Sequence, residues 1–273
     1  MASMSNPAFN SPAFQLNQTS AIVNRATPAP SAEQLDELYG RPSATPADTD
    51  RMTYEDTIQK AVGAFAILAV GAAIGWFLPI LAIPAAIAGF VLALVNIFKK
   101  KTVPALVLAY SAVQGVFVGG ISAIFEMTQY QGIATQALIG TAAVFTATLL
   151  LFRSGKIRAS KRATKVFLIA LVGYALFSLV NLGLMLFGVT TSEFGLRTWV
   201  IPGLGIPLGV VLGVLVVILA AYSLVLDFDA VKRGVENGAP RQFAWRAVFG
   251  IVLTVVWLYI EILRLLAILR GGE

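Results

Sequence analysis

Ionisable side chains interrupt the apolar runs near the carboxyl end of the chain, and these are the residues best able to do chemistry. Asp227 closes one long apolar run, and Glu261 and Arg264 lie inside the last one. An ionisable group at the centre of a membrane helix costs about 2.5–3.5 kcal/mol on insertion scales, so it usually faces a protein interior or a watery path. This placement predicts a functional site, around which the rest of the chain forms a wall.

Glu261 lies fifteen residues after Arg246 and nine before Arg270. Along a helix these separations are roughly 22 and 13 Å, so Glu261 reaches neither membrane surface. Arg264 follows three residues later, which places both side chains on one helix face. One interpretation is a structural ion pair that neutralises itself for insertion. The other is a gate, because a charge pair in lipid needs a further polar neighbour, which Asp227 of the preceding helix would supply.

Two more acids are secondary candidates. Asp229 lies beside Lys232 and Arg233, which also fits an interfacial carboxylate in water. Glu126 ends the third apolar run and is either solvated or at a pore mouth. We expect no resident metal site, only a transient cation contact at Asp227 and Glu261.

Composition places the chain in the membrane. Of its 273 residues 58% are hydrophobic and 12% are charged, against about 45–50% and about 25% in soluble domains. Cysteine and histidine are both absent, which excludes disulfides, thiolate or imidazole metal sites and histidine-assisted nucleophiles. Gly203-Leu204-Gly205 is followed by Ile206, not by the aspartate of intramembrane aspartyl proteases. We therefore expect neither enzymatic activity nor a cofactor.

Seven apolar stretches are long enough to cross a hydrocarbon core of about 30 Å. They lie at roughly 58–78, 81–98, 103–125, 134–152, 164–187, 206–226 and 247–269. The sequence thus predicts an all-α membrane protein of seven transmembrane helices, the last of them central. Gly115, Gly119, Gly120, Ala142 and Ala143 are small residues that predict helix-packing faces.

The net charge of +6 reflects membrane topology rather than nucleic-acid binding, because the basic residues cluster in alternate loops. The remaining loops, around 126–133 and 188–205, contain one basic residue between them, Arg197. By the positive-inside rule the amino terminus is cytosolic and the carboxyl terminus is outside. Residues 1–52 are rich in Asn, Ser, Pro, Ala and Gln and predict a disordered cytosolic tail. Residues 53–273 then form the transmembrane domain, starting at a helix cap on Thr53 and Asp56.

Three segments in the last two apolar stretches are distinctive: Leu226-Asp227, Leu258-Tyr259-Ile260-Glu261 and Ile268-Leu269-Arg270. Together with the seven apolar stretches, they resemble the Bax inhibitor family of transmembrane proteins. Glu261 stands where the family usually has Asp. The tail repeats Pro-Ala-Phe, at Pro7-Ala8-Phe9 and Pro12-Ala13-Phe14. These repeats and the segment Asp227-Phe228-Asp229 are similar to a prokaryotic branch of the family, which implies a multi-pass protein of a prokaryotic plasma membrane.

The resemblance implies a calcium leak channel whose conductance depends on pH. Its sensor would be Asp227 and Glu261, which share a proton. We expect that in the closed state the two acids either share this proton or bond to Arg264. The implied partners are the lipid bilayer and calcium as the transported ion. The alternative is a membrane adaptor without transport activity, which regulates a membrane protease or another membrane assembly and so has a membrane-protein partner.

Overall fold

The computed structural model describes residues 31, 50–99, 101–128, 130–190 and 192–271, and the predicted disordered tail lies outside this part apart from residue 31. Within these ranges the fold is all-helical and has no strands beyond two isolated bridges. Seven helical segments there are long and apolar enough to cross a membrane. They are α3 (Tyr54–Phe77), α4 (Ala82–Phe98, preceded by a 3-10 turn at Pro79–Leu81), α5 (Pro104–Met127), α6 (Ile133–Arg153), α7 (Lys161–Leu186), α8 (Leu208–Glu236) and α9 (Phe243–Arg270). The predicted fold class is confirmed, and the predicted orientation stays a prediction.

The sixth span continues well past its predicted end. The apolar run stops at residue 226, but α8 is helical to Glu236. Two ion pairs at i,i+4 spacing, Asp229 with Arg233 and Lys232 with Glu236, stabilise this polar extension. Asp227 therefore lies inside a helix rather than at the end of one.

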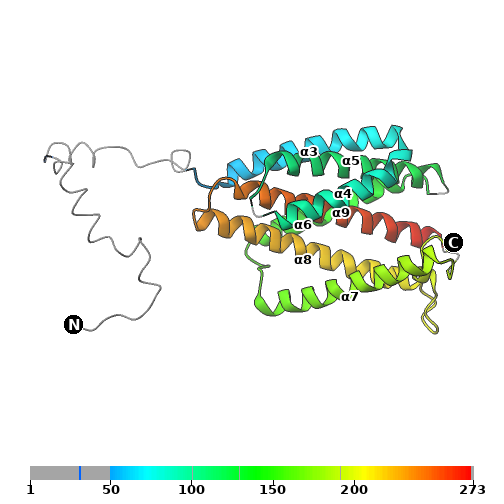
Figure 1. Cartoon of the computed structure of the whole chain (residues 1–273). Helices are drawn as coiled ribbons and strands as arrows, with labels where there is room; N and C mark the ends of the chain where they lie inside the picture. Colours follow the sequence, from blue (N-terminus) through cyan, green and yellow to red (C-terminus); the bar gives the residue numbers. More distant parts are fainter. Residues whose placement is uncertain (1–30, 32–49, 100, 129, 191, 272–273) are drawn as a thin grey trace, which may run out of the picture. The chain divides into compact units, whose positions relative to one another are not determined.

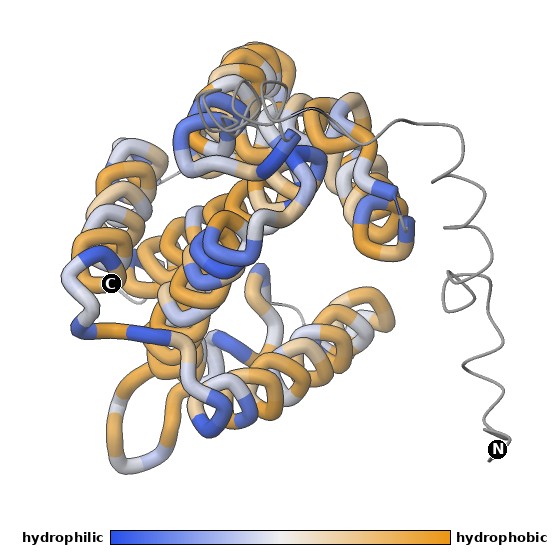
Figure 2. Tube along the Cα trace, turned by 90° about the vertical axis from the view of Figure 1, so that its left-hand side faces the viewer, coloured by the Kyte–Doolittle hydropathy of each residue, from blue (hydrophilic) through white to orange (hydrophobic). Residues whose placement is uncertain are grey.

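The last helix is central, as predicted. α9 contacts α3, α5, α6 and α8, and it runs through the middle of the bundle in Figure 1. Val248 and Val252 join a core cluster with residues of α3 and α5. Leu258 and Leu263 join another with α6 and α8. Figure 2 shows hydrophobic residues along the helices and hydrophilic segments at helix ends and in loops.

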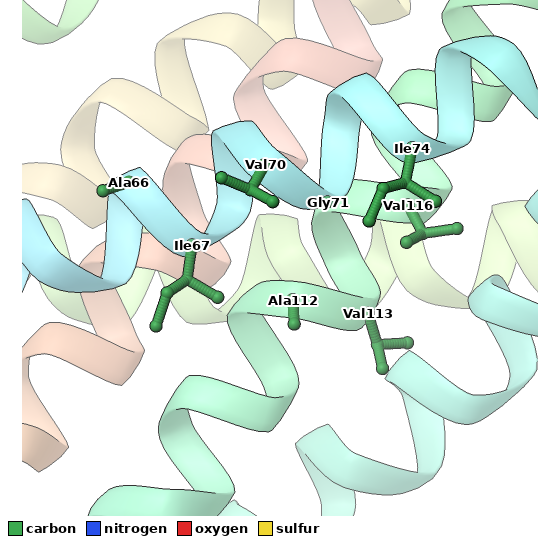
Figure 3. A pocket seen from close by; sticks show the side chains of 8 residues that line it. All are labelled: Ala66, Ile67, Val70, Gly71, Ile74, Ala112, Val113 and Val116. Carbon is green, nitrogen blue, oxygen red and sulfur yellow. The ribbon is translucent and has the colours of Figure 1, made fainter.

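Helices α3 and α5 approach closely because glycines face the partner backbone. A Cβ added to Gly119 would lie 1.9 Å from the carbonyl oxygen of Ala72. Gly115, Gly119 and Gly120 are buried, which confirms the predicted packing face. The same prediction is wrong for Ala142 and Ala143, which are exposed on α6. A hollow of about 370 Å³ lies on the α3–α5 seam. The residues that line it, labelled in Figure 3, are all apolar.

The amino terminus of α3 is fixed as predicted. Thr53 is its N-cap, and the Thr53 hydroxyl accepts a hydrogen bond from the Asp56 backbone N–H at 3.1 Å. The Asp56 carboxylate also binds Arg241 of the α8–α9 loop, whose Nε donates at 2.9 Å. This hydrogen bond raises the pKa of Arg241. The contact joins the start of α3 to the loop before α9.

Helix α7 lies at the edge of the bundle (Figure 1). Its buried residues are Phe167 and Asn181. The hydroxyl of Thr164 lies 3.1 Å from that of Tyr222 on α8, and the rings of Phe167 and Tyr222 are in contact. Polar contacts thus contribute much of what holds α7 in place.

Candidate functional site

Glu261 is the centre of a buried charged cluster. Its side chain is 4% exposed. Oε1 accepts hydrogen bonds from the Tyr174 hydroxyl of α7 and from Arg264 Nη1, the latter at 2.9 Å. Arg264 Nη1 also donates to the Tyr174 hydroxyl at 3.1 Å. The predicted neighbourhood of Glu261 and Arg264 is therefore present, and it ties α9 to α7.

Arg197 is a second cation of this cluster, and sequence reasoning missed its role. It lies on the 3-10 turn Gly195–Thr198 between α7 and α8, yet it is only 4% exposed. Its Nη2 donates to the hydroxyls of Tyr174 and Ser178, each at 3.0 Å. Its Nη1 lies 4.0 Å from Glu261 Oε2. One feature of the sequence points to this role. Arg197 is the single basic residue in two loops that contain no other basic residue.

The turn that carries Arg197 is held by Asn181 of α7. The Asn181 side-chain oxygen accepts from the Leu196 backbone N–H at 2.7 Å, and its nitrogen donates to the Phe194 carbonyl at 3.3 Å. The guanidinium carbon of Arg197 also lies 5.3 Å from the ring centroid of Tyr174. A loop segment is thereby packed into the helical bundle with its charge inside.

Asp227 occupies a different environment, between α8 and α9. Its Oδ2 accepts a hydrogen bond from the Thr254 hydroxyl at 2.7 Å. The Ser223 hydroxyl lies 3.3 Å from that of Thr254. A Cβ added to Gly250 would be 3.0 Å from Asp227 Oδ1, so the carboxylate lies against this glycine. In the described part of the chain no ion pair involves Asp227.

The structure does not bring Asp227 and Glu261 together, and the predicted shared proton does not hold in it. Thr254, the partner of Asp227, is seven residues before Glu261 on α9. This separation is about 10 Å along a helix. The physical reason is that α8 runs on beyond Asp227, which places that residue beside the first half of α9. The two carboxylates form separate sites with different partners.

The secondary candidates both have local partners. Asp229 pairs with Arg233 at 2.6 Å on the same helix. Glu126 accepts hydrogen bonds from the backbone N–H groups of Gly132 and Ala134, at 2.7 and 3.0 Å. Glu126 therefore caps the start of α6, where the helix dipole favours an acid.

The polar side-chain atoms that the hydrogen bonds bring together at Asp227 are oxygens, from its own carboxylate and from the hydroxyls of Thr254 and Ser223. Carboxylate and hydroxyl oxygens are the ligands that hard cations such as Ca²⁺ prefer. Among the residues that the structure describes, His, Cys, Asp and Glu nowhere form a group of three or more suited to a metal ion. What the geometry offers at Asp227 is one carboxylate with two hydroxyls nearby, at the boundary of two helices.

Comparison with known protein families places the chain in context. A family model described as "Bax inhibitor 1 like" matches residues 6–271, nearly the whole chain and including most of the amino-terminal tail. None of the curated proteins matches the chain.

Proposed function

The chain belongs to the Bax inhibitor 1 like family of membrane proteins, and on this basis we propose that it is a pH-sensitive leak channel for calcium and similar hard cations. In this proposal calcium is cargo, and the protein has neither a cofactor nor enzymatic activity. We further propose that it is a multi-pass protein of a prokaryotic plasma membrane.

The observation that carries the proposal is the Asp227 site. A carboxylate between two membrane helices changes the charge of their interface when it gains or loses a proton. The hydroxyl of Thr254 donates to Asp227 when the acid is ionised and accepts from it when the acid is protonated. Both protonation states therefore have a partner, and the helix contact differs in charge between them.

We assign a different role to the Glu261 cluster. Two arginines face this carboxylate, so its charge is compensated within the bundle. Charge-assisted hydrogen bonds are roughly twice as strong as neutral ones. We propose that Glu261, Arg264 and Arg197 hold α7 and the α7–α8 loop against α9, and that Asp227 responds to pH.

The test is calcium entry into liposomes that contain the purified protein, measured with a trapped dye between about pH 6 and about pH 8, where perturbed carboxylates titrate. Wild type should leak calcium in a pH-dependent manner. Asp227→Asn, which keeps the shape but cannot change charge, should remove the pH dependence. Asp229→Asn is the matched control, because this acid lies on the same helix and pairs with Arg233 on it, and its flux should follow wild type.

Two results would count against the proposal. A pH profile of Asp227→Asn that equals wild type would refute the sensor. Absence of flux at every pH would refute the channel and favour the membrane adaptor without transport activity.

A further inference from the structure

A large groove opens between α3 and α6, and neither Asp227 nor Glu261 is among the residues that line it. Its volume is about 1330 Å³, above the range of about 300–1,000 Å³ that is common for small-molecule sites. Most of the residues that line it are apolar and lie on α3 and α6, and residues of α8 and α9 complete the lining. The principal apolar residues are Ile58, Val62, Leu138, Leu149, Ile251 and Val255.

The groove has the length of one membrane leaflet. Along α3 it extends from Tyr54 to Ala66, and along α6 from Leu138 to Arg153. The end residues of these stretches are twelve and fifteen positions apart, which is about 18 and about 22 Å along a helix. Half of a hydrocarbon core of about 30 Å is about 15 Å. One acyl chain with its headgroup therefore matches the groove from the membrane surface to the bilayer centre.

One end of the groove is basic. Arg153, Arg158 and Lys232 line it there, together with the acid Asp229. Asp229 is paired with Arg233, and Lys232 lies 3.7 Å from Glu236. No ion pair within the described ranges involves Arg153 or Arg158. Two guanidinium groups, which suit phosphate oxygens in a fork geometry, are thus left at the mouth of an apolar channel.

From this complementarity of charge and length we propose that the α3–α6 groove is a binding site for one anionic phospholipid. The phosphate binds Arg153 and Arg158, and an acyl chain lies along Ala66 and Ala142 toward the bilayer centre. Basic pockets between membrane helices on the cytoplasmic side bind anionic headgroups, and the basic loops predict that this end is cytosolic. Tyr54 at the mouth lies where aromatic residues gather at membrane interfaces.

The headgroup part is tested by native mass spectrometry of the purified full-length protein with added phosphatidylglycerol or phosphatidylcholine of the same acyl chains. Wild type should retain phosphatidylglycerol in preference. Arg153→Gln with Arg158→Gln should weaken its retention by about 30-fold, as expected for two basic groups near an anionic surface. The control, Lys161→Gln with Arg162→Gln, removes the same charge from exposed residues outside the groove and should retain the preference.

The chain part is tested by filling the groove. Ala142→Phe places a ring in it and should reduce retention of both phospholipids. Ala143→Phe adds the same ring to the neighbouring exposed residue outside the groove and should leave retention unchanged. Because both alanines are exposed, both variants should fold, which their thermal unfolding checks.

Equal retention of the two phospholipids by wild type would overturn the proposal, since bulk lipid alone explains that result. So would unchanged retention in the double arginine variant or in Ala142→Phe, or a groove occupied by a peptide of this chain or another. None of these measurements depends on ion flux, so the lipid site and the proposed channel can be refuted independently of each other.

Discussion

Replacing Glu261 with glutamine should destabilise the protein more than any other single substitution in its cluster. The cluster has two arginines around one carboxylate, and the side chains of Arg197 and Glu261 are 5% and 4% exposed. Without the anion, Arg197 is left with the neutral hydroxyls of Tyr174 and Ser178 as acceptors. Removing one partner of a buried ion pair costs about 3–5 kcal/mol. For a chain of this size that corresponds to a melting temperature lower by about 6–20 °C.

A double-mutant cycle separates this charge effect from a simple loss of packing. In the Glu261→Gln background Arg197 is a buried cation without an anion, and Arg197→Gln removes it. The double variant should therefore regain part of the stability that Glu261→Gln loses. Coupling energies for residues in one ion network are about 0.5–3 kcal/mol. Arg264→Gln alone should cost less than Glu261→Gln, because its side chain is 29% exposed and Arg197 still neutralises the carboxylate.

The assay is thermal unfolding followed by circular dichroism in one detergent at fixed ionic strength. The reasoning is refuted if Glu261→Gln melts within about 2 °C of wild type, a shift below about 1 kcal/mol. It is also refuted if the double variant melts lower than the sum of the single shifts, because no stranded charge would then have been removed.

Other regions of the bundle give further predictions. Thr53→Ala removes the cap of α3 and should cost about 1 kcal/mol, measured by the same thermal unfolding. Gly119→Ala should prevent the close packing of α3 and α5, because the added Cβ would lie 1.9 Å from a backbone oxygen. The yield of folded protein should therefore fall. The control is Gly63→Ala, whose added Cβ has nothing within 4 Å, and this variant should express normally. Asn181→Ala should release the backbone at residues 194–197, seen as faster hydrogen exchange there and not in the core of α9.

The helices could be predicted from the sequence because each needs only local information. About twenty apolar residues in a row must be helical in lipid, where every backbone group needs an internal partner. The cap at Thr53 and the face made by Gly115, Gly119 and Gly120 follow from short spacings in the same way. These features depend on neighbours a few residues away.

The contacts between helices could not be predicted in the same manner. The apolar run ends at residue 226, yet α8 continues to Glu236 on ion pairs that the hydropathy pattern does not show. That extension sets the register of α8 against α9, and with it the partner of Asp227. A pattern of small residues also does not distinguish those that contact a neighbouring helix from those that do not. Ala142 fits a packing face by sequence, yet in the structure it lines the groove.

The different compensation of the two acids argues for different roles. Glu261 is surrounded by cations from two segments, α9 itself and the α7–α8 loop, so a change of its charge alters the attachment of both α7 and that loop. Asp227 has a neutral hydroxyl partner and a glycine beside it, so a change of its charge alters only the α8–α9 interface. A sensor must change state without dismantling the fold that carries it. Asp227 meets this condition, which supports the proposal that it responds to pH. Glu261 does not, because its ion pairs hold the α7–α8 loop against α9.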